Sequence, residues 1–151
     1  MKLNRIILVS IILVMAFVVP VVSAPPTPRC PSKVTGGGQI GFTICLDYHR
    51  ANFGFNIQCA RCELKGELQY IDHLTGMKIH IHDMHSLVFN DLGSGNWCAQ
   101  FSGTDVYSGE IVDVHVHDNG EPGTADLFEI WGPGGYHGIG NPILHGNIQV
   151  H

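Results

Sequence analysis

The sequence has few charged residues, and after residue 24 it has no window with the length and period of an amphipathic helix. Charged residues make up 14% of the 151 residues, against roughly 25% in typical soluble domains, which excludes a highly charged disordered chain. Only 8 Lys and Arg stand against 13 Asp and Glu, so no basic surface for nucleic acid is expected. The sequence also shows no phosphate-binding loop, cofactor fingerprint or Ser/His/Asp pattern, and it favours a non-enzymatic domain over an enzyme.

Residues 1–24 have the pattern of a secretory signal peptide. Two basic residues precede an apolar run over residues 6–19, and small residues follow at 22–24. Because Pro25 hinders cleavage directly before it, the mature chain is expected to start at Ala24 or Pro25. Retention of the segment as a membrane anchor is the open alternative, since the run is just long enough to span a bilayer. Either outcome predicts a secreted or cell-surface location, with membrane contact only if the segment is retained.

The exported part is expected to be β-structure. Residues 25–38 form a Pro- and Gly-rich lead-in with a flexible break at Gly36–Gly38, and residues 39–151 form a single β domain. Apolar and polar side chains alternate with a period of two, as in half-buried antiparallel strands, and Asp72 is assigned to the polar set. The sequence therefore predicts an all-β antiparallel sandwich or small barrel of roughly seven to nine short strands after an N-terminal signal helix. The apolar positions are Phe53, Phe55, Ile57, Leu68, Tyr70, Met77, Ile79, Ile81, Val112, Val114, Val116, Ile148 and Val150.

Six segments follow one another along almost the whole exported part. They are Val34-Thr-Gly-Gly-Gly-Gln-Ile40, Phe53-Gly-Phe-Asn56, Gly66-Glu-Leu-Gln-Tyr-Ile-Asp-His73, Phe101-Ser-Gly-Thr104, Asp118-Asn-Gly-Glu-Pro-Gly123 and Gly146-Asn-Ile-Gln-Val-His151. Together they resemble the post-COAP domain family of exported bacterial and archaeal proteins. The resemblance implies export and an all-β fold, and it implies no settled activity. The family often has cysteine where this chain has Asp105, so a family disulfide through that position is not carried over.

Five of the ten histidines lie in two short segments, each with a His-x-His pair followed by Asp. Residues two apart in a strand share a face at about 6 to 7 Å, within reach of one metal ion. If the two strands pair side by side, four imidazoles converge on one Cu, Zn or Ni ion. The alternative is that these are solvent-facing strand residues. The predicted metal residues are His80, His82, His115 and His117, with Asp83, Asp118 and His85 as further candidates, whereas His49, His73, His137, His145 and His151 are interpreted as surface residues.

The five cysteines are an odd number for an exported chain, in which disulfides are the default. Cys59 and Cys62 are predicted to form a disulfide across a turn, and a thiolate metal site with Cys45 or Cys98 is the alternative. Cys30 stands in the lead-in and is the first candidate for an unpaired or intermolecular thiol.

Two classes of function follow from these patterns. The first is an exported, non-enzymatic β domain that binds a transition metal through the His-x-His strands. The second is a structural subunit of an extracellular filament or surface assembly, joined through the N-terminal segment and Cys30. A cupin-like or dismutase-like metalloenzyme is a weaker alternative, because Pro133–His137 and His115-Val-His117 resemble only parts of those motifs.

Overall fold

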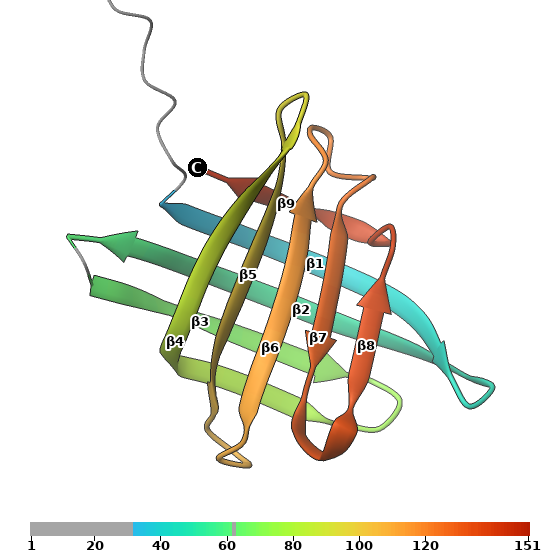
Figure 1. Ribbon diagram of the computed structural model, residues 1–151. Coiled ribbons are helices and arrows are strands. Elements are labelled where there is room, and N and C mark those ends of the chain that lie inside the picture. The colour runs from blue at the N-terminus through green and yellow to red at the C-terminus, as the bar shows by residue number, and fades with distance from the viewer. Residues whose placement is uncertain (1–31, 62) are drawn as a thin grey trace, which may run out of the picture.

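The strands of the chain form one antiparallel sheet that curls into a half-barrel with a sandwich-like core (Figure 1). The structure is a computed structural model, and it describes residues 32–61 and 63–151. Over these residues the prediction of an all-β antiparallel fold is confirmed. The described strands are β1 (Lys33–Ile44), β2 (Asp47–Ala60), β3 (Glu63–Asp72), β4 (Lys78–Gly93), β5 (Asn96–Asp105), β6 (Ile111–Asp118), β7 (Leu127–Trp131), β8 (His137–Gly140) and β9 (His145–Val150).

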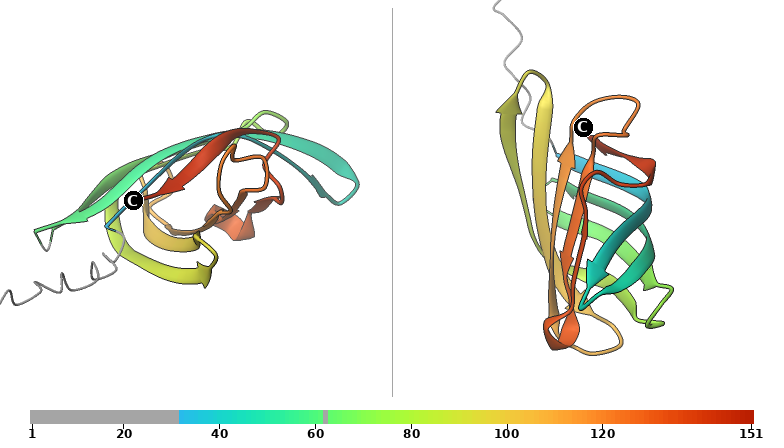
Figure 2. Two further views of the ribbon diagram at one scale, coloured as in Figure 1. Left: turned by 90° about the horizontal axis from the view of Figure 1, so that it is seen from above. Right: turned by 90° about the vertical axis from the view of Figure 1, so that its right-hand side faces the viewer.

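The strand order is β8-β7-β6-β5-β4-β3-β2-β1-β9, so each strand from β1 to β7 lies beside the strand that follows it in the chain. Strand β4 connects two layers, because its residues Lys78–Ile81 pair with β3 and its residues from Ile81 onward pair with β5. Register shifts after Ile81 and after Met84 bend it between these parts. Strands β9, β1, β2 and β3 then form one layer and β5 to β8 the other (Figure 2).

The core lies between the two layers and is rich in aromatic rings. Phe53 of β2 stacks on Phe128 of β7 with ring centroids 4.1 Å apart, and Phe55 lies 5.2 Å from Phe101 of β5. The apolar positions of the predicted alternation, Met77 and Val150 apart, are buried. Burying such side chains contributes about 1.5 to 3 kcal/mol each, so this face fixes which way every strand is turned.

Two expectations about the strands were wrong, one about where the first strand begins and one about strand length. Gly36–Gly38 do not form a flexible break, because they lie inside β1 and pair with both β2 and β9. A side chain at Gly36 would lie 2.5 Å from Cζ of Phe55, so glycine here allows a core ring to approach the backbone. The strands are also not all short, since β1, β2 and β4 have 12, 14 and 16 residues.

The outer edge of β9 is covered by side chains from the connection between β6 and β7. The N–H of Ile148 donates to Asp126 at 2.8 Å, and the N–H of Val150 donates to Asp118 at 2.9 Å. Glu121 accepts hydrogen bonds from the side chains of Asn147 and Gln149. Carboxylates therefore occupy donors that a further strand would otherwise use.

Candidate functional site

The two His-x-His pairs lie on strands that are not neighbours. Strand β5 separates β4 from β6, and Gln100 of β5 faces Val88 of β4 on one side and His115 on the other. His115 is therefore level with Val88, about 20 Å along β4 from His82. The expectation that the two strands pair was wrong, because short turns make each strand the neighbour of the next. Residues 32–61 and 63–151 contain no group of three or more His, Cys, Asp or Glu side chains placed to hold a metal ion.

The additional metal candidates have other partners. His85 Nε2 lies 2.9 Å from Thr104 Oγ1, while Asp83 is exposed and 3.9 Å from the same ring nitrogen. Asp118 accepts hydrogen bonds from the N–H groups of Gly120 and Val150. These groups belong to local hydrogen bonding in β4 and at the edge of β9.

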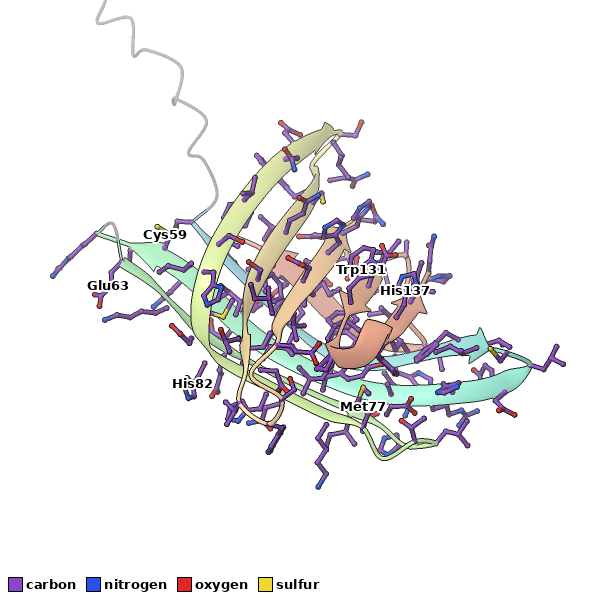
Figure 3. All side chains as sticks on the ribbon, turned by 60° about the horizontal axis from the view of Figure 1, so that its bottom comes forward. Cys59, Glu63, Met77, His82, Trp131 and His137 are labelled. Atoms are coloured by element: carbon purple, nitrogen blue, oxygen red, sulfur yellow. The ribbon has the colours of Figure 1, made fainter. Side chains whose placement is uncertain are left out.

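His80 and His82 do lie close together. Their ring centroids are 6.0 Å apart, with the ring planes at 85°. His80 Nε2 is buried and has no hydrogen-bond partner among the described residues. His82 is exposed at the bend of β4, away from Trp131 and His137 (Figure 3). On β6, His115 instead packs edge-on against Trp131 at 4.6 Å, and His117 faces Cys98 of β5.

Several predictions concern residues outside those that the structure describes. Cys59 is exposed at the end of β2, but Cys62 is not described, so their disulfide stays a prediction. The signal segment, Cys30 and assembly through the lead-in also lie outside the described residues. Within the described ranges, no helix is long and apolar enough to cross a membrane.

A cavity of about 600 Å³ opens where the β1–β2 hairpin meets the turn between β7 and β8. Phe42, Ile44 and Met77 supply apolar side chains, and Pro133–Tyr136 forms the opposite wall. Figure 3 shows Met77 near the turn between β7 and β8. The described residues that line the cavity include no Asp, Glu, Lys or Arg. An apolar concave site of this size with few polar groups is typical of small-ligand binding.

A hydrogen-bonded chain of four side chains begins at the cavity, where His49 and Tyr136 belong to the lining. His49 Nδ1 is 2.7 Å from Asp72 Oδ2, and the hydroxyl of Tyr136 donates to the same oxygen at 3.0 Å. The hydroxyl of Tyr70 lies 2.6 Å from that of Tyr136, whose hydrogen is already directed at Asp72. Tyr70 is therefore the donor in that bond. The chain links β2 and β3 in one layer to the β7–β8 turn in the other.

The carboxyl group of Asp72 is ionised within this chain. Burial by itself raises its pKa, but hydrogen bonds from His49, the Leu74 N–H and Tyr136 outweigh burial and hold the pKa below its usual value. Burial, together with the hydrogen bond to Asp72 and the charge of that carboxylate, raises the pKa of Tyr136 far above its ordinary range. At neutral pH the hydrogen-bonded chain therefore contains one carboxylate, on Asp72, and two neutral phenols, on Tyr70 and Tyr136.

The contact with Asp72 also determines the form of the His49 ring. An ionised carboxylate only accepts hydrogen bonds, so Nδ1 carries a hydrogen, and in the neutral form of the ring Nε2 is an acceptor. His49 lines the cavity, its side chain is 6% exposed, and Nε2 bonds to no described residue. The cavity thus offers a ligand one oriented imidazole nitrogen among mainly apolar side chains.

Reasoning from the sequence missed this site. His49 was interpreted as a surface residue and Asp72 as part of a polar strand face, whereas both are buried. The available signal was the alternation itself, since Asp72 has the same parity as Leu68 and Tyr70, and His49 the same parity as Phe53. A polar residue at a buried parity indicates a side chain with a fixed partner.

Comparisons with family models, curated proteins and solved structures found no match to this chain, and the resemblance to the post-COAP family stays a prediction.

Proposed function

We propose that this chain is an exported, non-enzymatic binding domain whose cavity takes an uncharged, largely apolar group. The supporting observation is that His49 lines a mainly apolar cavity, while Nδ1 of its ring is held by Asp72. The described part of the lining holds no carboxylate, amine or guanidinium group to bind an ion. A group with one hydrogen-bond donor fits best, because it satisfies Nε2 while its apolar part covers Phe42 and Met77.

A neutral fluorescent probe tests this proposal. N-phenyl-1-naphthylamine is apolar, carries one N–H donor and brightens when it leaves water. Ile44→Trp places a larger side chain in the cavity and is expected to weaken binding of the probe about tenfold. Val88→Trp is the matched control, since Val88 is half-exposed on the outer face of β4. Equal binding by both variants, with circular dichroism unchanged, would contradict the proposal.

We propose a second binding activity for His80 and His82, which together take one Cu(II), Zn(II) or Ni(II) ion. The ring spacing of 6.0 Å and the unpartnered Nε2 of His80 favour it. Because imidazole must be neutral to bind metal, affinity should fall as the pH is lowered.

Calorimetry with each metal salt tests this second activity. The variant with His80→Ala and His82→Ala should lose binding. The matched variant with His115→Ala and His117→Ala should keep it, since β5 separates the two pairs. Loss of binding only in the second variant would reject the assignment.

A further inference from the structure

Two open strand edges border the cavity. Strand β1 pairs with β9 only as far as Gln39, opposite His145, although β1 continues to Ile44. Among the strands that the structure describes, β8 pairs with β7 alone and lies at the end of the strand order. The last residues of β1 and the whole of β8 therefore each have one edge without a neighbouring strand.

The backbone groups on these edges follow from strand alternation, in which every second residue directs its N–H and C=O to the same side. The carbonyl of Gln39 accepts the N–H of Leu144 on the open side of β1, so Thr43 also faces that side. The carbonyl of Tyr136 accepts the N–H of Gly132 on the β7 side, so His137 and Ile139 face away from β7.

These open backbone groups meet at the cavity. Thr43, His137 and Ile139 all line it, and no backbone hydrogen bond joins β1 to β8 within residues 32–61 and 63–151. The two strands pack closely at the other end of β8, where a side chain at Gly140 would clash with the side chain of Ile40. From there toward Ile44 the strands leave the cavity between them, as a wedge with polar backbone on both walls.

We propose that this wedge binds an extended peptide segment of another protein, which enters as an additional strand between β1 and β8. This inference rests on the proposed function and names its ligand. Main-chain hydrogen bonds to His137, Ile139 and Thr43 hold the segment. One large apolar or aromatic side chain of the peptide fills the cavity, and a phenol at this position donates to His49 Nε2.

The chain's own lead-in fits the wedge poorly. Strand β1 begins at Lys33, and ten residues of strand, about 33 Å, separate it from Thr43. Residues 25–32, which directly precede β1, extend about 27 Å at most. Prolines at positions 25, 26, 28 and 31 also lack the N–H groups that a strand ladder needs. A partner segment without proline is therefore the better occupant.

Amide exchange with a defined peptide tests the proposal. The probe is acetyl-Thr-Thr-Phe-Thr-Thr-amide, titrated into the full chain while hydrogen exchange is followed by NMR. Exchange at His137, Ile139 and Thr43 should slow by about tenfold or more at saturation. A peptide with Gly in place of Phe, and one N-methylated at alternate amides, should each bind about tenfold more weakly. Equal binding by the N-methylated peptide, or unchanged exchange at these residues, would overturn the proposal.

A pair of variants isolates the backbone donor on β8. Tyr136 has φ −61° and ψ 134°, the extended conformation that a following proline requires, and the His137 N–H faces away from β7. His137→Pro removes that N–H, whereas His137→Ala removes only the imidazole. Peptide binding should be about tenfold weaker in His137→Pro than in His137→Ala.

The neutral naphthylamine probe separates failure of this inference from failure of the proposed function. If the parent chain binds the naphthylamine but not the peptide, the cavity is a small-molecule site and the peptide inference is wrong. If it binds neither, both proposals fail. Retained naphthylamine binding in His137→Pro would show that the variant is folded, so that weaker peptide binding reports the lost N–H.

Discussion

His49 Nδ1 and Asp72 Oδ2 lie 2.7 Å apart, with both side chains almost fully buried. The two residues belong to neighbouring strands, and Tyr136 joins them from the opposite layer through its bond to the same carboxylate oxygen. The carboxylate of Asp72 thus accepts hydrogen bonds from β2, from the turn between β3 and β4, and from the turn between β7 and β8. Because the turn forms a wall of the cavity, the carboxylate fixes both the His49 ring and the shape of the site.

Asp72→Asn should make the protein less stable at neutral pH. Hydrogen bonds to a charged group contribute about 1.5 to 3 kcal/mol, and the amide is a poorer partner for the donors on Nδ1 and Tyr136. Urea unfolding of the parent and the variant at about pH 7 measures the difference.

The effect of Asp72 should also depend on pH in one direction. Its native pKa lies below the usual 3.8, so the stability it contributes is complete above that value and is lost as pH falls through the native pKa. The stability difference between parent and Asp72→Asn should therefore shrink in strong acid. A difference that stays constant from neutral pH into strong acid would show that the charge of Asp72 is not its source.

Tyr136→Phe should cost more stability than Tyr70→Phe. The Tyr136 hydroxyl takes part in two hydrogen bonds, one to a carboxylate, whereas the Tyr70 hydroxyl makes one bond at the end of the chain. The expected losses are about 2 to 3 kcal/mol and about 1 kcal/mol. Thermal or urea unfolding compares the two variants, which remove the same atom at different positions. A larger loss of stability in Tyr70→Phe would contradict this prediction, because it would mean that the Tyr70 hydroxyl makes the stronger hydrogen bond.

The alternation of side chains was enough to predict the fold class. Phe53 and Phe55, like Val112, Val114 and Val116, face the core as predicted, because burial of one face determines strand orientation. Alternation does not say which strands become neighbours, and this is why His80 and His115 were expected to share an ion although β5 lies between them. Neighbours follow from short turns along the chain, and the bend in β4 follows from the register shifts after Ile81 and after Met84.

The candidate site could not be predicted from the pattern of side chains along single strands. Asp72 and Tyr136 are 64 positions apart in the chain, and only the curling of the sheet brings their side chains together. The unpaired edges of β1 and β8 were not predicted either, because the length of β1 was underestimated when Gly36–Gly38 were interpreted as a break.

Gly36→Ala should destabilise the protein, and Gly54→Ala should not. A methyl group at Gly36 would lie 2.5 Å from Cζ of Phe55, a buried ring with little room to move, so we expect a loss of about 1 to 3 kcal/mol. A methyl group at Gly54 meets no atom within 4 Å, and alanine there also reduces the freedom of the unfolded chain. Urea unfolding of both variants checks the contrast. Equal stability would mean that the ring of Phe55 moves freely.

The carboxyl group of Asp126 accepts hydrogen bonds from the N–H groups of Asn119 and Ile148 at the edge of β9. Burial raises its pKa, the two N–H bonds lower it, and the charges of Asp118 and Glu121 raise it again, with a net increase. Glu121→Gln keeps an oxygen that can accept from Asn147 and Gln149 but removes one of these charges. The pKa of Asp126 should therefore fall toward its usual value.

A carboxyl group with a raised native pKa favours folding below that pKa, and this contribution is lost as pH rises through it. The loss between acid and neutral pH should thus be smaller in Glu121→Gln than in the parent. Titration of the Asp126 carboxyl carbon by NMR measures the pKa directly, and urea unfolding across the same pH range measures its consequence. Asp113→Asn is the control, since it removes a charge from β6 that is not among the causes of the shift. If both variants move the titration of Asp126 equally, the shift reflects net charge and not the position of Glu121.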